Sequence, residues 1–256
     1  MEDFKEKTAI VTGATSGIGR AVAVKLAAEG ARVAAVGRNQ EKLTALQGEI
    51  EQAGGTIEII RADVTNESAP QKIVETTVEN FGQIDILINA AGIIGNGTIE
   101  NTALEAWDEM MNINVRSVFL LMQKAVPFLE QTKGNIVNVS SVSGLRAFPG
   151  VLAYCVSKAA VDQLTRCVSL ELAPKRIRVN AVNPGVVVTE LHKRGGMNDE
   201  NYTAFLEKST QTHPLGRVGT ADEVADLILF LASEKAGWIT GVTYSIDGGR
   251  ANTAAR

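Results

Sequence analysis

The stretch Thr8–Gly19, TAIVTGATSGIG, joins a short apolar run to a glycine-rich turn. The run Thr8–Thr12 has the pattern of a buried strand, and Gly17–Glu29 has the pattern of a helix. Glycine permits the tight turn between them and lets the backbone approach a pyrophosphate, while the helix N-terminus offers unpaired N–H groups. The stretch therefore predicts a first strand–helix unit that binds a dinucleotide.

Strands and helices alternate along the rest of the chain. Further strands are expected at Arg32–Val36, Thr56–Arg61, Ile84–Asn89, Asn135–Val139, Arg178–Val182 and Val242–Ile246. Helices are expected at Gln40–Ala53, Glu67–Phe81, Leu104–Glu130, Ala153–Leu172 and Ala221–Ala232. The strand runs are almost continuously apolar, which is typical of parallel strands covered on both faces. The pattern predicts an α/β fold: a doubly wound, Rossmann-like parallel sheet of about seven strands with helices on both faces.

Local signals add detail to this outline. Capping boxes are expected at Thr102 with Glu105 and at Thr220 with Glu223. The sequence shows no repeat and no linker, so residues 1–256 are expected to form a single domain. The polar stretch 190–219, with a short helix near Glu200–Ser209, interrupts the alternation. Insertions of this length typically act as lids or binding loops, so a substrate loop is expected here.

The composition is that of a soluble globular protein, with 45% hydrophobic and 21% charged residues. A net charge of −4 argues against broad binding to nucleic acid or anionic membranes. The two histidines form no metal-ligand spacing, and Cys155 and Cys167 lie on one expected helix, too far apart to pair. No apolar run approaches the roughly 18 residues of a membrane helix. The segment Met1–Lys5 lacks the apolar region of a signal peptide, so a cytoplasmic protein is expected.

Tyr154 and Lys158 stand four residues apart, and Ser141 precedes the tyrosine by thirteen residues. Residues i and i+4 share one face of a helix, so the phenol and the ammonium can point into one pocket. An unperturbed tyrosine has a pKa of about 10, too high for acid–base catalysis at neutral pH. A nearby cation favours the phenolate, so Lys158 is expected to lower the pKa of Tyr154. The arrangement indicates a site for carbonyl or alcohol redox chemistry.

With these residues and a Thr-Gly-x-x-x-Gly-x-Gly turn, the chain resembles the short-chain dehydrogenase/reductase family from Lys7 to about Gly249. The resemblance implies that Tyr154 donates the proton during carbonyl reduction and that Ser141 hydrogen-bonds the carbonyl oxygen. It gives Lys158 a second role, holding the nicotinamide ribose. It also places Asn114, in Asn114-Val115-x-Ser117-Val118-Phe119, at the position that holds a proton-relay water, with Asn112 as a weaker match.

The expected cofactor residues follow successive strands. They are Gly13, Ser16, Gly17, Ile18, Gly19, Arg38, Asp63, Val64, Asn89, Ala90, Gly92, Pro184, Gly185, Val187 and Thr189, together with Tyr154 and Lys158. The resemblance assigns Asp63 to the adenine amino group, and Val187 and Thr189 to the nicotinamide carboxamide. Ala90 departs from the family's Asn-Asn-Ala-Gly, so the second asparagine contact is lost, while Asn89 and the Gly92 backbone should still shape the cofactor floor.

The end of the second expected strand bears on cofactor choice. An NAD site usually carries an acidic residue here for the ribose hydroxyls, but this chain has Gly37 followed by Arg38. A guanidinium can pair with a 2′-phosphate through charge-assisted hydrogen bonds. Ser16 stands where some NADP-preferring relatives carry an extra basic residue. NADP(H) is therefore the expected cofactor, with NAD(H) as the alternative.

The leading interpretation is an NADP(H)-dependent oxidoreductase that interconverts a small-molecule ketone and a secondary alcohol. A 3-oxoacyl carrier-protein reductase shares every motif, although Lys175-Arg176 and Lys193-Arg194 offer only a modest basic surface for an acidic carrier. A sugar dehydrogenase also stays open, and the alternative without turnover is a nucleotide-binding regulator. Substrate-pocket candidates are Ile93-Ile94-Gly95, Val142 to Val151 and the 190–219 loop, with apolar Leu145, Phe148, Val151, Met197 and Phe205 and polar Arg146 and His192.

Two expected helices carry more apolar surface than one buried stripe requires. Ala153–Leu172 has apolar residues on more than one face, and Leu104–Glu130 is similar around Val118–Met122. Pairing these helices across a dimer would bury the excess, and Leu227–Leu231 with Trp238 and Tyr244 could form another contact. The family resemblance favours the same arrangement, so a homotetramer is expected.

Overall fold

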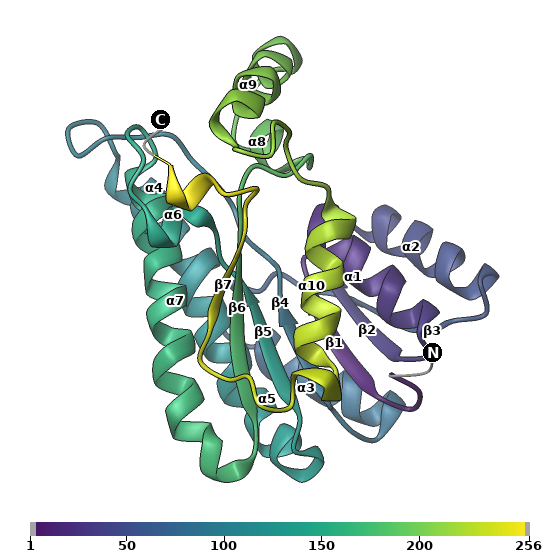
Figure 1. Cartoon of the computed structure of the whole chain (residues 1–256). Coiled ribbons are helices and arrows are strands. Elements are labelled where there is room, and N and C mark those ends of the chain that lie inside the picture. The colour runs from purple at the N-terminus through teal and green to yellow at the C-terminus, as the bar shows by residue number, and fades with distance from the viewer. Residues whose placement is uncertain (1–3, 254–256) are drawn as a thin grey trace.

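A parallel sheet organises the computed structural model, which describes residues 4–253. The order of its strands is β3-β2-β1-β4-β5-β6-β7, and every neighbouring pair is parallel. The strands are β1 (Thr8–Thr12), β2 (Arg32–Gly37), β3 (Thr56–Arg61), β4 (Ile86–Asn89), β5 (Asn135–Val139), β6 (Arg178–Pro184) and β7 (Thr243–Ile246). The predicted fold class is confirmed, and Figure 1 shows the twisted sheet between its helices. Residues 1–3, part of the segment without a signal-peptide pattern, lie outside the described residues.

The helices cover both faces of the sheet. One layer consists of α1 (Gly17–Ala28), α2 (Gln40–Gln52) and α10 (Ala221–Ala232), and the other of α3 (Ala69–Phe81), α5 (Ser117–Thr132) and α7 (Leu152–Leu172). The remaining segments are α4 (Leu104–Met111), η1 (Asn112–Arg116), α6 (Val142–Leu145), η2 (Ala173–Lys175), α8 (Leu191–Arg194), α9 (Asp199–Thr212), η3 (Glu234–Ala236) and η4 (Arg250–Asn252).

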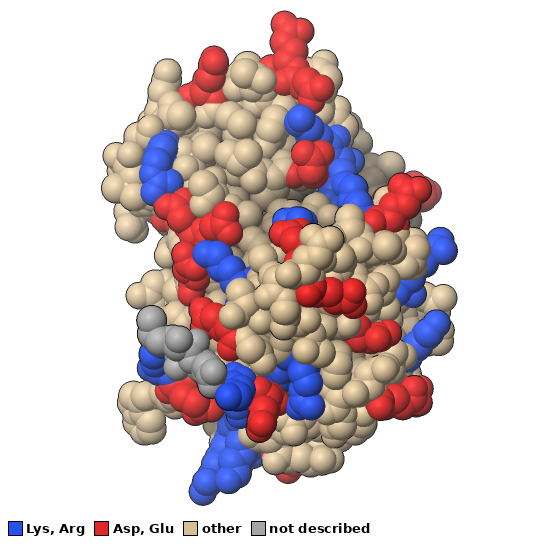
Figure 2. Space-filling view, turned by 90° about the vertical axis from the view of Figure 1, so that its right-hand side faces the viewer, with Lys and Arg blue, Asp and Glu red and all other residues tan. Residues whose placement is uncertain are grey.

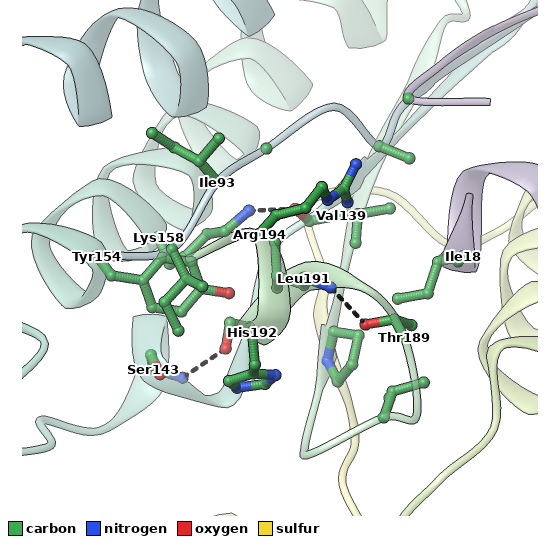
Figure 3. Close-up of a pocket in the computed structure, with 18 of the residues that line it drawn as sticks. Ile18, Ile93, Val139, Ser143, Tyr154, Lys158, Thr189, Leu191, His192 and Arg194 are labelled. Carbon is green, nitrogen blue, oxygen red and sulfur yellow. Dashed lines mark hydrogen bonds between the residues drawn. The ribbon is translucent and has the colours of Figure 1, made fainter. Parts of the chain in front are cut away.

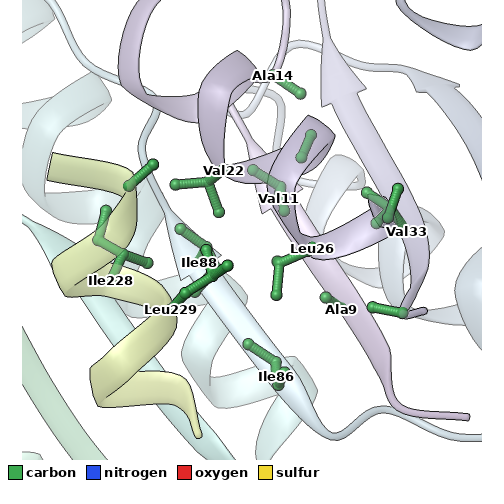
Figure 4. Close-up of a cluster of buried hydrophobic side chains, with 14 of the residues drawn as sticks. Ala9, Val11, Ala14, Val22, Leu26, Val33, Ile86, Ile88, Ile228 and Leu229 are labelled. Atoms are coloured by element: carbon green, nitrogen blue, oxygen red, sulfur yellow. The ribbon is translucent and has the colours of Figure 1, made fainter. Parts of the chain in front are cut away.

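The alternation of side chains along β1 divides the core in two. Ala9 and Val11 face α1 and α10, whereas Ile10 faces the layer with α3 and α5. Figure 4 shows the first of these clusters, in which Leu26 from α1 and Ile228 from α10 converge on β1 and β4. Because both faces are buried, the strands need apolar residues at consecutive positions, and this is the pattern that revealed them in the sequence.

The helix expected over Leu104–Glu130 is wrong as a single element. It divides into α4, the wide π-helical turn η1 over Asn112–Arg116, and α5. Such turns insert an extra residue into a helix and occur frequently at functional sites. Here the Ser117 hydroxyl donates to the Ile113 carbonyl at 2.5 Å, and Asn114 is almost completely buried. A sequence pattern at helical spacing does not distinguish this wider turn from the helices on either side.

One of the two expected capping boxes is present. The Thr220 side chain accepts from the Glu223 backbone, and the Glu223 side chain accepts from the Thr220 backbone at the start of α10. The box expected at Thr102 is wrong, because α4 is capped by Ala103 and the Thr102 hydroxyl donates instead to the Thr98 carbonyl at 2.6 Å. The Thr102 side chain therefore stabilises the local turn that begins at Thr98 and does not cap the helix.

The 190–219 stretch forms α8 and α9, which stand beyond the carboxyl edge of the sheet in Figure 1. The short helix expected near Glu200–Ser209 is present and extends over Asp199–Thr212. Among the described residues, no helix is both long and apolar enough to span a membrane. On the face shown in Figure 2, acidic and basic side chains are interspersed.

Candidate active site

A cavity of about 470 Å³ opens at the carboxyl edge of the sheet. It contains most of the residues singled out from the sequence: Gly13, Ser16, Gly17, Ile18, Gly19, Arg38, Asp63, Val64, Ala90, Gly92, Ser141, Tyr154, Lys158, Pro184, Gly185, Val187 and Thr189. Two expected residues, Asn89 and Asn114, do not line it. Carboxyl ends of neighbouring parallel strands meet at one edge, which is why segments so far apart in sequence share this cavity.

The glycine turn after β1 leaves no room for side chains. Gly13 has φ +66°, and a Cβ there would lie 2.7 Å from the Ala90 carbonyl oxygen. A Cβ on Gly19 would lie 2.5 Å from the Gly13 oxygen. Ser16 caps α1 without a side-chain hydrogen bond to its first N–H groups, so these groups stay available to an anion. The bare backbone beside a helix N-terminus fits a dinucleotide pyrophosphate.

Arg38 and Asp63 lie together at the far end of the cavity. The Arg38 Nη1 is 3.7 Å from Asp63 Oδ2, and the two side chains are 65% and 45% exposed, respectively. Asp63 Oδ1 accepts from the Thr65 backbone at 3.0 Å and from its hydroxyl at 2.7 Å. The Thr65 backbone bond is the main reason that the pKa of Asp63 is lowered, with a further contribution from Arg38. The carboxylate is therefore ionised and already oriented within its turn.

A carboxylate on β2 would not fit this end of the cavity without rearrangement. A Cβ on Gly37 would lie 2.5 Å from the Thr15 Cγ2. The glycine therefore belongs to the packing of the first turn as well as to the cofactor pattern.

Asn89 lies beneath the cavity floor instead of on it. Its Nδ2 donates to Asn138 Oδ1 at 2.8 Å, and Asn138 in turn donates to the Thr165 hydroxyl at 3.0 Å. The floor itself is fixed by Thr12, whose hydroxyl oxygen accepts from the Ala90 and Ala91 N–H groups at 3.1 Å each. The sequence placed Thr12 at the end of the first strand but did not indicate that its hydroxyl would hold the backbone after β4.

The structure brings Ser141, Tyr154 and Lys158 to one wall of the cavity. Figure 3 shows Tyr154 and Lys158 beside each other, both pointing from α7 into the cavity. The Lys158 Nζ lies 5.7 Å from the Tyr154 ring centroid and donates to the Val139 carbonyl at 2.8 Å. Ser141 caps α6, and its Oγ accepts from the Ser143 N–H at 3.1 Å. This bond uses the Ser141 oxygen as an acceptor, so its hydroxyl proton can be donated to a group on the cavity side.

Burial dominates the protonation of this wall. It raises the pKa of Tyr154 to about 12, although the hydrogen bond with Ser141 acts in the opposite direction. Burial lowers the pKa of Lys158 to about 8, partly offset by Asp162. The expectation that Lys158 lowers the pKa of Tyr154 is wrong for this arrangement. The same desolvation that disfavours the phenolate also disfavours the ammonium.

Asn114 braces the cavity wall from behind. Its Oδ1 accepts from the Ile93 N–H at 2.9 Å, and its Nδ2 donates to the Ile93 carbonyl and to Ser157 Oγ, both at 3.0 Å. The amide therefore connects η1 to the loop after β4 and to α7. The rival Asn112 is only half-buried and accepts from Arg116 at 3.3 Å.

Two side chains that sequence reasoning did not single out for this role hold the segment after β6. The His213 Nε2 accepts from the Val186 N–H at 3.1 Å, and the His213 Nδ1 donates to the Ser209 carbonyl at 2.6 Å. The Tyr202 hydroxyl accepts from the Thr189 N–H at 3.1 Å and donates to the Thr189 carbonyl at 2.9 Å. The substrate loop thus fixes the backbone on which Val187 and Thr189 lie.

The substrate end matches the expected pocket in part. Ile93, Ile94, Val142, Phe148, Val151, His192, Met197 and Phe205 line it, whereas Gly95, Leu145 and Arg146 do not. Within the stretches that the sequence indicated, Ser143, Leu191, Arg194, Lys208, Ser209 and Thr212 also line it, whereas Asn96 and Arg250 lie outside those stretches and were not indicated. His192 is stacked on Phe205 with ring centroids 4.6 Å apart, and burial lowers its pKa. Cys155 and Cys167 are unpaired, and the described residues contain no His, Cys, Asp or Glu cluster suited to a metal.

Comparisons with known proteins agree with this geometry. A family model described as enoyl-(acyl carrier protein) reductase matches residues 13–251. The 3-oxoacyl-[acyl-carrier-protein] reductase FabG of Thermotoga maritima is 39% identical, over 95% of this chain and 97% of the relative. The chain belongs to the short-chain dehydrogenase/reductase family. It is an oxidoreductase of alcohol and ketone substrates in a family that uses nicotinamide cofactors.

Other relatives in the family carry different substrate names. A 3beta-hydroxysteroid dehydrogenase of Mediterraneibacter gnavus is 38% identical, over 97% of this chain and 96% of the relative. A crystal structure of a short-chain dehydrogenase/reductase of unknown function from Caenorhabditis elegans, with cofactor, superposes with a TM-score of 0.93. It is 36% identical and covers 98% of this chain and 97% of that one. The similarity extends over nearly the whole chain, but the relatives are named for different substrates.

Asn114→Ala should lower both turnover and stability. The substitution removes the hydrogen-bond partner of the Ile93 backbone and of the Ser157 hydroxyl. Each buried polar group that is left unpaired lowers the free energy of unfolding by about 1–3 kcal/mol. Urea unfolding and steady-state kinetics would measure the two effects. Asn112→Ala is the matched control and should change neither by much, because its half-buried amide accepts a long hydrogen bond from the exposed Arg116. Equal effects of both substitutions would contradict the bracing role of Asn114.

Proposed function

We propose that the protein is an NADP(H)-dependent oxidoreductase that interconverts a small-molecule ketone and a secondary alcohol. The observation that carries this proposal is the position of Ser141, Tyr154 and Lys158 on one wall of the cavity that begins at the glycine turn. A nucleotide-binding regulator without turnover would not need a buried phenol, hydroxyl and ammonium converging on the same space.

The bound cofactor supplies or accepts the hydride. Tyr154 donates its proton to the oxygen that becomes the alcohol, and its raised pKa keeps the phenol protonated at neutral pH. Ser141 donates a hydrogen bond from its hydroxyl to the same oxygen and stabilises the charge that develops there. Lys158 holds the ribose and is steadied by the Val139 carbonyl. Asn114 acts through the wall that it braces, by its hydrogen bonds with Ile93 and Ser157.

NADP(H) is favoured over NAD(H) by the residues around β2. Gly37 presents no carboxylate, and a side chain there would have to displace the Thr15 methyl group. Arg38 lines the cavity with most of its side chain exposed, so it is available to a 2′-phosphate. The nearby Asp63 offers its Oδ2 to the adenine amino group.

The second candidate is a 3-oxoacyl carrier-protein reductase. It is favoured by the names of the Thermotoga maritima relative and of a Staphylococcus aureus relative that is 38% identical. An acidic carrier would need free surface cations. Lys175 is 2.6 Å from Glu130, and Lys193 is 2.7 Å from Asp199, so half of the basic surface identified in the sequence is already paired. This pairing is why the small-molecule reaction stands first. No specific observation favours a sugar dehydrogenase.

Tyr154→Phe should reduce turnover by about 10²–10⁴-fold, the usual contribution of a positioned acid or base. The ring stays in place, so the fold and NADPH binding should persist. Both are measurable, by circular dichroism and by fluorescence titration, alongside NADPH oxidation against a panel of ketones. Tyr244→Phe is the matched control, since that tyrosine is half-exposed on β7. A folded, NADPH-binding Tyr154→Phe protein with more than about a tenth of wild-type turnover would require another acid.

Arg38→Ala should raise the KM for NADPH about ten- to a hundred-fold and leave that for NADH little changed. The reason is the loss of one charge-assisted hydrogen bond to the 2′-phosphate, which is worth about 1.5–3 kcal/mol. Arg61→Ala serves as the control for charge alone, because Arg61 is exposed on the neighbouring β3 and does not line the cavity. A wild-type protein with higher kcat/KM for NADH would refute the preference.

Assembly into a homotetramer is part of the same proposal. Phe119 on α5 and Val156 on α7 are about 40–50% exposed, and Trp238 is fully exposed near Tyr244 in sequence. Large apolar side chains of this kind are stabilised when a second copy covers them. Light scattering at micromolar concentration should give about four times the chain mass of 27.2 kDa. A monomer under those conditions would exclude this assembly.

A further inference from the structure

Basic side chains gather at the substrate end of the cavity. The residues that line this end include Arg194, Lys208 and Arg250. Of the described residues that line the cavity, Asp63 is the only acidic one, and it lies beside Arg38 at the opposite end. The protein as a whole carries a net charge of −4, so this local excess of positive charge runs against its overall balance.

Arg250 is the best-positioned of these cations. It begins η4, directly after the turn that follows β7. Its guanidinium carbon lies 4.9 Å from the centroid of the Phe148 ring, and its Nη1 donates to the Thr212 hydroxyl. Phe148 and Thr212 also line the cavity, so two walls orient the guanidinium within it. A guanidinium has five N–H donors, and most of them remain available to a ligand.

Among the described residues, the charge of Arg250 is opposed only through space, by the carboxylate of Asp247. Arg250 forms no ion pair there, and the nearby Asp247 carboxylate is engaged by the backbone N–H groups of Gly249 at 3.0 Å and Ala251 at 2.6 Å. Burial lowers the pKa of Arg250, and the charge of Arg146 lowers it further. Arginine nevertheless stays protonated in proteins. A partly buried cation without a direct ion pair can form a strong charge-assisted hydrogen bond with an anionic ligand.

Arg146 holds η4 in place as a second cation behind Arg250. Its Nη1 donates to the carbonyl oxygens of Arg250 at 3.1 Å and Ala251 at 3.2 Å, and also to that of Thr253. This anchors the segment over α6, the short helix that Ser141 caps. Figure 1 places η4 beside α6, away from the turn between β1 and α1. An anion on Arg250 would therefore belong to the substrate and not to the cofactor phosphates.

His192 adds a neutral polar group to the same end. Its Nδ1 is buried and has no hydrogen-bond partner among the described residues. Figure 3 shows the ring on the side of the cavity where Ser143 and Tyr154 lie. The apolar side chains of Phe148, Met197 and Phe205 make up much of the remaining surface. The end therefore suits a short alkyl chain that carries one anionic group.

We propose that Arg250, oriented by Phe148 and Thr212, binds a carboxylate of the substrate, so that the preferred substrates are oxo acids and the corresponding hydroxy acids. This inference rests on the proposed function. In the reductive direction the ketone carbon gains a hydride from NADPH and the oxygen gains the Tyr154 proton, while the carboxylate stays unchanged. The carboxylate fixes the distance of the ketone from Arg250 and thereby selects the chain length.

The test compares straight-chain oxo acids, with one, two or three methylenes between ketone and carboxylate, with their methyl esters. The ratio of kcat/KM for acid over ester isolates the contribution of the charge. The wild-type ratio should exceed one for at least one chain length and fall about ten- to a hundred-fold in Arg250→Gln, the usual value of one charge-assisted contact. Arg250→Lys should keep part of the ratio, because it keeps the charge but loses the planar fork.

A matched control accounts for the change in net charge. Arg176→Gln removes an exposed arginine between η2 and β6, outside the cavity, and should leave the ratio at its wild-type value. Circular dichroism and NADPH titration would confirm that each variant is folded. If Arg250→Gln does not fold, the comparison of Arg250→Lys with the wild type decides, and an unchanged ratio together with an unchanged KM would overturn the proposal.

Further arms separate this proposal from its alternatives. A 3-oxoacyl phosphopantetheine thioester that is preferred over its dephosphorylated form and over every oxo acid, in an Arg250-dependent manner, would assign the site to a carrier phosphate and overturn the carboxylate. A wild-type protein that prefers the esters would also overturn it. Turnover of neutral ketones in that case would leave the proposed function intact, whereas no turnover of any carbonyl compound would contradict both.

Discussion

All seven strands run in one direction, and both faces of the sheet they form are covered by helices. Each connection must therefore return from the carboxyl end of one strand to the amino end of the next. The segments that follow β1, β4, β5 and β6 thus all begin at the carboxyl ends of the strands, where they lie close together. The glycine turn, the Ala90–Gly92 floor, Ser141 and the segment from Pro184 reach the same cavity for this reason. The parallel topology alone brings these segments together, without a ligand.

A buried polar network supports the cavity from below. Asn89, Asn138 and Thr165 form a chain of hydrogen bonds across β4, β5 and α7, and Asn183 donates to both oxygens of Asp162 at 3.1 and 2.9 Å. Buried amides are costly unless they are paired, and paired ones fix the geometry of the groups above them. Burial raises the pKa of Asp162, while the hydrogen bonds from Ser140 and Asn183 oppose this shift. The wall that carries Ser141, Tyr154 and Lys158 is therefore held in place by buried hydrogen bonds that would be costly to break.

The pKa values of Tyr154 and Lys158 are set more by the burial of these side chains than by nearby charges. Tyr154 and Lys158 are 7% and 6% exposed, so the phenolate and the ammonium both lose hydration. Their pKa values, about 12 and about 8, move in the directions that favour the neutral forms. A protonated phenol suits carbonyl reduction, and Lys158, with its pKa of about 8, is still mostly protonated at neutral pH. The basic residues at the substrate end, Arg250 above all, add further positive charge.

The sequence by itself determined the strands, the glycine turn and the Tyr154–Lys158 pair, because apolar runs, tight turns and i,i+4 spacing are set by interactions between residues near in the chain. Only the tertiary structure decided that Asn89 and Asn114 face away from the cavity, that a π-helical turn interrupts the helix after Leu104, and that His213, Tyr202 and Arg250 join the site. His213 meets Val186 across 27 residues, and Arg146 meets Arg250 across 104. Contacts over such separations depend on how the helices pack on the sheet, and no local periodicity encodes that packing.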